Sequence, residues 1–176
     1  MKDKINILLL GVGPIGQAVS QQLISHPGCE IIAAVDINPH LQGVDLGELV
    51  TNNANQVIIS ANLKKAIANH KIDIAVVCTS SKATIVVEQI TPLLEAGISV
   101  VTSCEELLYP WQTQPELASS LNQLATQYRA SVLATGVNPG FLMDFLPLSL
   151  TAISQKIDHI HIRRVQNASS RRQSFQ

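Results

Sequence analysis

The chain has 176 residues, of which 46% are hydrophobic and 14% are charged. This composition can bury the core of one ordinary domain, or of one domain and part of another, and it argues against disorder. The formal net charge of -1 leaves no basic field to attract nucleic acid or an anionic membrane surface, so we expect neither as a partner.

Apolar runs of strand length alternate with helical segments up to residue 134. The predicted strands cover residues 5–10, 30–35, 57–60, 72–77, 98–102 and 131–134. Helical spacing predicts one helix from Ile15 until His26 stops it, and others over 63–69, 83–96 and 116–128. The strand runs are continuously apolar, which is typical of parallel strands that are buried on both faces. The alternation predicts an α/β fold, a Rossmann-type doubly wound parallel sheet.

Local signals refine the expected helix boundaries. Gly97 is expected to close the helix before it, and Pro92 is expected to kink or restart that helix. Thr113 and Glu116 have the spacing of a capping box, which indicates where the last of these helices opens.

The pattern changes after about residue 156, where apolar and polar residues alternate. We interpret residues 156–176 as the first strand of a truncated second domain and residues 1–155 as the dinucleotide-binding domain. His159 and His161 share one face of this strand, but no third ligand has suitable spacing. Exposed or interdomain histidines are therefore expected here, and no metal site.

Three glycines follow the first predicted strand in the segment G-V-G-P-I-G. Gly11 allows a tight turn, Gly13 lets a diphosphate approach the backbone, and Gly16 lets the helix pack on the strand. The helix starts at Pro14 and Ile15. Pro14 has no N–H of its own, and the rest of the helix N-terminus offers free N–H groups and the positive end of the helix dipole to phosphates. The alternative is a tight turn that binds no ligand.

Asp36 ends the second predicted strand, where this fingerprint places an acid for the ribose hydroxyls of adenosine. Its charge would repel the 2′-phosphate of NADP, and residues 37–40 contain no Lys or Arg to offset it. We therefore expect NAD as the cofactor, with NADP as the alternative if Lys64 or Lys65 reaches the site. The structural alternative for Asp36 is a solvent-facing acid.

Further residues are expected along the same groove, because open α/β sheets bind ligands outside the carboxyl ends of their strands. Thr79 and Ser80 follow the fourth strand, and Asn138 and Pro139 follow the sixth. We expect all four to line the groove towards the nicotinamide. For the last two, the alternative is an ordinary loop that leads into a helix near Phe141.

Two adjacent acids, Glu105 and Glu106, follow the fifth strand and are the candidate catalytic residues. Glu106 has capping-box spacing from Ser103, which gives it a structural alternative at a helix start. Glu105 is a candidate general base, and its alternative is an acid that favours a helix N-terminus. Sequence position leaves both interpretations of Glu105 open.

Cysteine usage and the N-terminal pattern bear on location. Cys29, Cys78 and Cys104 form no C-x-x-C pair, so neither a disulfide framework nor a zinc site is indicated. The N-terminal apolar run is too short for a signal peptide or a membrane span. We expect reduced thiols and a cytoplasmic protein.

Four segments carry a resemblance to a known family: GVGPIG, VDINPHLQGVDLGEL, TSCEELLYP and ATGVNPGFLMDFLP. They resemble the N-terminal NAD(P)-binding domain of the dihydrodipicolinate reductase-like superfamily. Within it, the chain most resembles the amine dehydrogenases, including the 2,4-diaminopentanoate dehydrogenases. The reductase branch carries a His-His-Lys cluster where this chain has R-R-V-Q at 163–166, so the reductase activity is not supported.

The resemblance implies an NAD(P)-dependent oxidoreductase that transfers hydride between nicotinamide and an amine or imine carbon. It favours Glu105 over Glu106 as the acid that assists ammonia and imine chemistry. It also implies small amine, ketone or imine substrates and a homo-oligomer in the full-length form. Family members carry a second domain with the substrate pocket, so we expect this chain to be a catalytically incomplete fragment. The alternative is a stand-alone dinucleotide-binding regulatory module without turnover.

Overall fold

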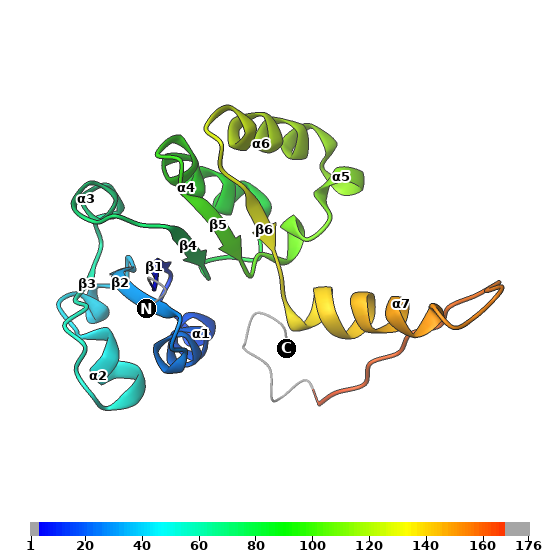
Figure 1. Ribbon diagram of the computed structural model, residues 1–176, viewed down its shortest axis with the longest axis horizontal. Helices are drawn as coiled ribbons and strands as arrows, with labels where there is room; N and C mark the ends of the chain where they lie inside the picture. The colour runs from blue at the N-terminus through cyan, green and yellow to red at the C-terminus, as the bar shows by residue number, and fades with distance from the viewer. Residues whose placement is uncertain (1–3, 168–176) are drawn as a thin grey trace. The chain divides into compact units, whose positions relative to one another are not determined.

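The computed structural model describes residues 4–167, which divide into two units between Thr135 and Gly136. The first unit is built on a sheet of strands β1 (Ile5–Leu10), β2 (Cys29–Val35), β3 (Ile59–Ser60), β4 (Ile74–Val77), β5 (Ser99–Thr102) and β6 (Val132–Ala134). All neighbouring strands are parallel, in the order β3-β2-β1-β4-β5-β6 (Figure 1). This is the strand order of a Rossmann fold, so the predicted fold class is confirmed.

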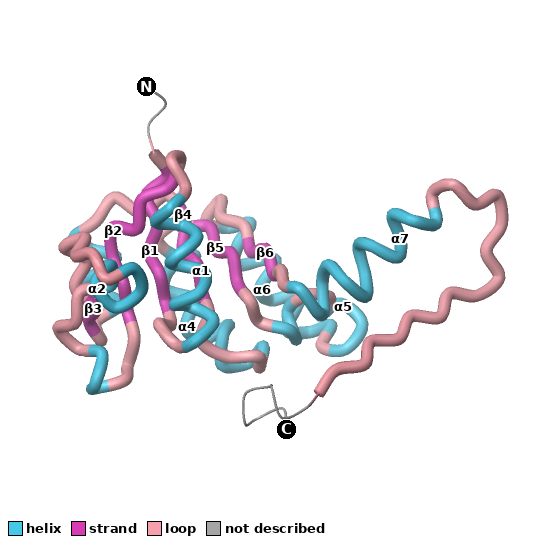
Figure 2. The backbone as a smooth tube through the Cα atoms, turned by 90° about the horizontal axis from the view of Figure 1, so that it is seen from below, coloured by secondary structure: helices cyan, strands magenta, loops and turns pink. Residues whose placement is uncertain are grey.

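Helices cover both faces of this sheet (Figure 2). They are α1 (Pro14–Ser25), α2 (Leu46–Thr51), α3 (Leu63–Asn69), α4 (Ala83–Glu95), α5 (Pro110–Thr113) and α6 (Pro115–Gln127), with 3-10 turns η1 (Pro39–Leu41) and η2 (Glu105–Leu107). In β1, Ile7 and Leu9 join a core with α1 and α2, whereas Leu8 and Leu10 join one with α3, α4 and α6. Burial on both faces explains why the strand runs are continuously apolar.

One of the predicted helix signals works differently in the structure. α6 begins at Pro115 and Gln114 precedes it without a side-chain cap, so the predicted capping box is wrong. Because Pro115 takes the first helical position, Gln114 and not Thr113 occupies the N-cap position. Pro92 lies inside α4, which runs through it without restarting.

The strand β3 is shorter than the predicted 57–60. The carbonyl of Val57 accepts a hydrogen bond from the N–H of Leu46, and Ile58 forms an isolated antiparallel bridge with Asp45. These bonds tie the start of the predicted strand to the loop before α2. Only the last two residues therefore pair with β2.

Over residues 136–167, the second unit contains a single helical stretch. Its backbone is non-helical at Asn138, Pro139 and Gly140 in the segment Val137–Phe145 (η3), and α7 (Leu146–Thr151) follows. The helical backbone therefore starts after Gly140, in agreement with the helix predicted near Phe141.

The alternating segment near the end of the chain forms no strand within residues 156–167. A strand needs a neighbour to satisfy its backbone N–H and C=O groups, and no other strand pairs with these residues in the described part of the chain. Residues 168–176 lie outside the described residues. The second domain expected from residue 156 onward therefore stays a prediction.

Candidate dinucleotide-binding site

The carboxyl ends of the central strands meet along one edge of the sheet. Leu10, at the end of β1, pairs with Val35 at the end of β2 and with Val77 at the end of β4. Val77 also pairs with Thr102 at the end of β5. The turns that follow these strands therefore lie next to one another, at the edge where open α/β sheets bind ligands.

The turn after β1 is packed too tightly for side chains at two of its glycines. Gly11 has a φ of +92°, and a Cβ on it would lie 2.8 Å from the carbonyl oxygen of Cys78. A Cβ on Gly16 would lie 2.0 Å from the carbonyl oxygen of Gly11. The tight turn and the close helix packing that the glycine pattern predicts are both present.

Gly13 differs from these two, because no heavy atom lies within 4 Å of the position of its missing Cβ. Pro14 opens α1, and the first turn of that helix contains no acid and no side-chain cap. Within residues 4–167, the N–H groups of Gly13, Ile15 and Gly16 have no hydrogen-bond partner. The turn thus presents unpaired donors around an open space, at the positive end of a helix dipole.

Asp36 lies directly beside this turn. Its Oδ2 accepts a hydrogen bond from the N–H of Val12 at 2.6 Å, and its Oδ1 accepts one from the N–H of Asn38 at 2.8 Å. The Nε2 of Gln42 donates to the Asp36 carbonyl at 2.6 Å, which holds the loop after β2. No ion pair joins Asp36 to a Lys or Arg within the described residues.

The loop after β4 carries two hydroxyl groups with different partners. Thr79 Oγ1 donates to Oε1 of Gln89 on α4 at 2.5 Å. The N–H of Lys82 donates to Oγ of Ser80 at 3.1 Å, which shapes the chain just before α4. Both hydroxyls sit at the same edge of the sheet as the glycine turn, as predicted from their position after the fourth strand.

The two candidate acids have different surroundings. Glu106 Oε2 accepts from the N–H of Ala83 at 2.9 Å and from Nε2 of Gln114 at 3.3 Å. The expected capping box with Ser103 is not formed, because Glu106 reaches the start of α4 instead. Glu105 is half-buried, and its side chain makes no hydrogen bond or ion pair within residues 4–167. Of the two candidate acids, Glu105 is therefore the one whose carboxylate has no hydrogen-bond or ion-pair partner in the described part of the chain.

The neighbouring thiols are poor nucleophiles. Burial raises the pKa of Cys78, and a hydrogen bond from Ser103 offsets this only in part. Burial also raises the pKa of Cys104, and the nearby charges of the two glutamates add to it. Both thiols therefore stay protonated at neutral pH, which agrees with their interpretation as small apolar residues.

Asn138 and Pro139 belong to the second unit. There they form part of the non-helical start of η3 and are half-buried. The N–H of Gly140 donates to Oδ2 of Asp144 at 2.7 Å, which fixes this loop to the helix that follows.

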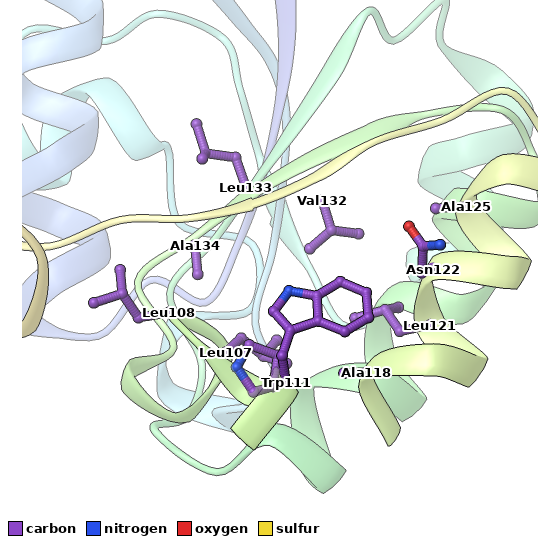
Figure 3. A pocket seen from close by; sticks show the side chains of 11 residues that line it. Leu107, Leu108, Trp111, Ala118, Leu121, Asn122, Ala125, Val132, Leu133 and Ala134 are labelled. Atoms are coloured by element: carbon purple, nitrogen blue, oxygen red, sulfur yellow. The ribbon is translucent and has the colours of Figure 1, made fainter. Parts of the chain in front are cut away.

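An open pocket of about 190 Å³ lies beside β6 (Figure 3). Side chains from α5, α6 and β6 line it, including Trp111, Leu121 and Val132. Asn122 and the indole N–H of Trp111 are its polar side-chain groups, and none of its lining residues is acidic or basic. The pocket supplies apolar surface but no group that can transfer a proton.

Two features are absent from the described residues: a cluster of metal ligands and a helix that could span a membrane. No three His, Cys, Asp or Glu side chains among residues 4–167 come together as metal ligands. His159 and His161 are exposed there. None of the helices described has both the length and the apolar character that crossing a bilayer requires.

Some of these contacts had no signal in the sequence. Nothing in the motif shows that Asp36 would bond to Val12 N–H, or that Gln89 would hold Thr79. Glu106 and Ala83 are far apart along the chain, and only the neighbouring positions of β4 and β5 bring them together.

Known proteins match most of this chain. Residues 5–104 match the family model described as dihydrodipicolinate reductase, N-terminus. Over 170 residues, the chain is 30% identical to 2,4-diaminopentanoate dehydrogenase of Acetoanaerobium sticklandii, covering 95% of this chain and 48% of that protein. It is 25% identical over 164 residues to an amine dehydrogenase of Streptomyces virginiae, covering 92% of this chain and 46% of that protein.

A solved structure is also similar. The amine dehydrogenase from Mycobacterium smegmatis matches with a TM-score of 0.80 and 33% identity, covering 88% of this chain and 45% of that one. This chain spans about half the length of the curated relatives that it matches. The family match includes β1, the glycine turn, Asp36 and every strand through β5, which is more than half of the chain. The chain therefore belongs to the family of dihydrodipicolinate reductase N-terminal domains, as its sequence motifs predict.

Proposed function

We propose that the first unit is the NAD-binding domain of an oxidoreductase that acts on CH–NH2 or C=N groups. The observation that carries this proposal is the open turn at Gly13 with the Asp36 carboxylate held beside it. The named activities of the relatives, which are dehydrogenases of amines, support the substrate class.

The cradle residues have separate tasks in this proposal. The free N–H groups of Gly13, Ile15 and Gly16 bind the diphosphate, while Gly11 and Pro14 set the turn and the helix start. Asp36 accepts hydrogen bonds from the ribose hydroxyls of adenosine. Each carboxylate oxygen has one backbone donor, so each retains a lone pair for a hydroxyl.

The order of the strands indicates where the other half of the cofactor lies. With adenosine over β2 and the diphosphate at the turn after β1, the nicotinamide half extends over β4 and β5. Thr79 and Ser80 follow β4 and are proposed to contact this half. The assignment of Asn138 and Pro139 to the cofactor remains a prediction from the sequence.

We propose NAD rather than NADP because Asp36 repels a 2′-phosphate. Lys64 and Lys65 are exposed on α3, and neither forms an ion pair with Asp36 within residues 4–167. No ion pair in that part of the chain neutralises the Asp36 charge that a 2′-phosphate would meet.

Glu105 is proposed to handle the proton. Bound nicotinamide supplies or accepts the hydride. When an amine is oxidised, its nitrogen must lose a proton before the hydride leaves the adjacent carbon. A half-buried carboxylate with no hydrogen-bond or ion-pair partner among the described residues is free to accept that proton, and it returns a proton to nitrogen in the reductive direction.

The remaining partner assignments also stay proposals. The substrates are small amines, ketones or imines. We propose that the protein forms a homo-oligomer and that it acts in the cytoplasm, from the resemblance and from the cysteine usage.

The proposal is tested by titrating the purified protein with NADH, NADPH and ADP-ribose. Tight binding of NADH and ADP-ribose with weaker binding of NADPH supports it, whereas no binding of any of the three contradicts it. The same samples are then assayed with 2,4-diaminopentanoate, and with simple ketones plus ammonia.

Glu105→Gln tests the proton-handling role, and Glu116→Gln, an exposed acid in the first turn of α6, is the matched control. Turnover that disappears only in Glu105→Gln, with NADH affinity retained, supports the assignment. Binding without turnover in the wild type favours the alternative of a dinucleotide-binding module or a catalytically incomplete fragment.

A further inference from the structure

Glu106 joins segments that are distant in the sequence. Its carboxylate accepts the N–H of Ala83, at the start of α4, and the side-chain amide of Gln114, just before α6. Its own N–H donates to the carbonyl of Ser81 at 3.3 Å. The turn after β5 is therefore bonded both to the loop after β4 and to the start of α6.

The bond to Ala83 supplies a cap that α4 otherwise lacks. The residue before the helix, Lys82, makes no side-chain cap, and the first turn of α4 has no acid of its own. The carboxylate of Glu106 accepts a first-turn N–H and faces the positive end of the helix dipole. Ala83 is 0% exposed with Glu106 in place, so its N–H has the carboxylate and not water as its acceptor.

The bond between Glu106 and Ala83 lies next to two segments of the proposed site: the loop after β4 and the turn that carries Glu105. Lys82 N–H, one residue before Ala83, donates to the hydroxyl of Ser80. Glu105 immediately precedes Glu106 in the turn η2. A shift at Ala83 is therefore passed to both of the segments that face the nicotinamide half in the proposed function.

We propose that Glu106 is a positioning residue, which holds residues 79–82 and the turn bearing Glu105 in place around the nicotinamide half of the cofactor. The inference rests on the proposed function. It requires only a hydrogen-bond acceptor at Glu106, because a single carboxylate oxygen makes both side-chain contacts. Glu106→Gln keeps such an acceptor, whereas Glu106→Ala removes it.

The test compares NADH with ADP-ribose, which lacks the nicotinamide, on the wild type and both variants. Glu95→Ala, at the far end of α4, is the control for loss of an exposed negative charge. Glu106→Ala is expected to weaken the binding of NADH about fivefold, which corresponds to the loss of one helix cap. It is expected to weaken the binding of ADP-ribose less than about twofold. Glu106→Gln and the control are expected to bind both ligands within about twofold of the wild type.

Amide hydrogen exchange gives a second measurement. The Ala83 amide should exchange faster in Glu106→Ala than in the wild type, and at the wild-type rate in Glu106→Gln. If Glu106→Ala does not fold, Glu106→Gln alone decides: NADH affinity within about twofold of the wild type supports the inference, and a loss of about fivefold or more overturns it.

Other outcomes separate the inference from the proposed function. Equal weakening of NADH and ADP-ribose in Glu106→Ala overturns the positioning role while the cofactor site stands. Wild-type protein that binds NADH no more tightly than ADP-ribose also overturns it, because residues 79–82 then contribute nothing to nicotinamide binding. Wild-type protein that binds neither ligand overturns the proposed function, and the inference falls with it.

Discussion

The Oδ2 of Asp36 accepts a hydrogen bond from the backbone N–H of Val12 at 2.6 Å. The contact joins the end of β2 to the middle of the glycine turn after β1. It orients the carboxylate beside the open space at Gly13 before any ligand is bound. An acid that is oriented in advance loses little freedom when it binds a ribose, so the contact favours cofactor affinity.

Asp36→Asn should therefore change which cofactor binds. The amide removes the charge that repels a 2′-phosphate and weakens the bonds to the ribose hydroxyls. We expect NADH affinity to fall about tenfold and the ratio of NADPH to NADH affinity to rise by at least that factor. Fluorescence titration at fixed ionic strength measures both.

Asp73→Asn is the matched control for that experiment. Asp73 also accepts a backbone N–H, that of Asn6 at 2.8 Å, but it lies at the opposite, amino end of the strands. Its substitution should leave the NADPH to NADH ratio unchanged. A change in the ratio with both variants, or with neither, would contradict the role of Asp36.

Substitutions at two glycines of the turn should have different effects on NADH affinity and on the free energy of unfolding. Gly13→Ala adds a methyl group to open space at a φ of -70°, so the free energy of unfolding should change by less than about 1 kcal/mol while NADH affinity drops. Gly16→Ala meets the carbonyl of Gly11 and should lower the free energy of unfolding by about 1–3 kcal/mol. Urea unfolding and NADH titration of both variants check this, and equal loss of affinity without any difference in stability would contradict it.

The fold could be predicted because each signal in the sequence was local. Continuous apolar runs such as residues 7–10 require burial on two faces, and flanking helices provide that. The glycine turn was predictable for the same reason, since its backbone geometry leaves no room for side chains at Gly11 and Gly16.

The partners of the site residues could not be predicted, because they depend on which strands become neighbours. Glu106 has the right spacing to cap its own turn, yet it caps α4, since β4 and β5 lie side by side and bring Ala83 within reach. The predicted strand 57–60 failed in its first half for a similar reason: contacts with the distant residues Asp45 and Leu46 overrode its local apolar pattern.

Asp45 should make stability depend on acid pH. Its carboxylate accepts backbone N–H groups of Glu48, Asn55 and Gln56, at 3.0, 3.0 and 2.7 Å, and these bonds lower its pKa below the usual 3.8. The Asp45 carboxylate therefore binds a proton more weakly in the folded state than in the unfolded state. The stabilisation is complete above pH 3.8 and is lost as the pH falls through the lower, folded pKa.

Asp45→Ala should accordingly unfold at a lower urea concentration than the wild type at about pH 7. The difference between the two urea midpoints should be smaller at about pH 3. Urea midpoints at the two pH values measure this. Glu95→Ala serves as the control, because the Glu95 side chain forms no hydrogen bond or ion pair within residues 4–167. If the difference in urea midpoints stays constant or grows on acidification, the stabilisation by these backbone contacts does not depend on an ionised Asp45 carboxylate.

Thr102, at the carboxyl end of β5, should matter for stability through its hydroxyl. It is 1% exposed, and its Oγ1 donates to the carbonyl of Val77 at 3.0 Å and accepts the N–H of Cys104 at 3.1 Å. Thr102→Val keeps the shape but leaves the buried Cys104 N–H without an acceptor. We expect the free energy of unfolding to fall by about 1–3 kcal/mol, measured by urea denaturation.

Thr91→Val is the matched control for this substitution. The Thr91 hydroxyl donates only to the carbonyl of Val87, one turn earlier in α4, and that carbonyl is within the helix. Losing this bond leaves no N–H unpaired, so the change should stay below about 1 kcal/mol. If the two variants lose equal stability, the cost comes from the hydroxyl group in general. A loss confined to Thr102→Val means that the bond to Cys104 holds the turn leading to Glu105.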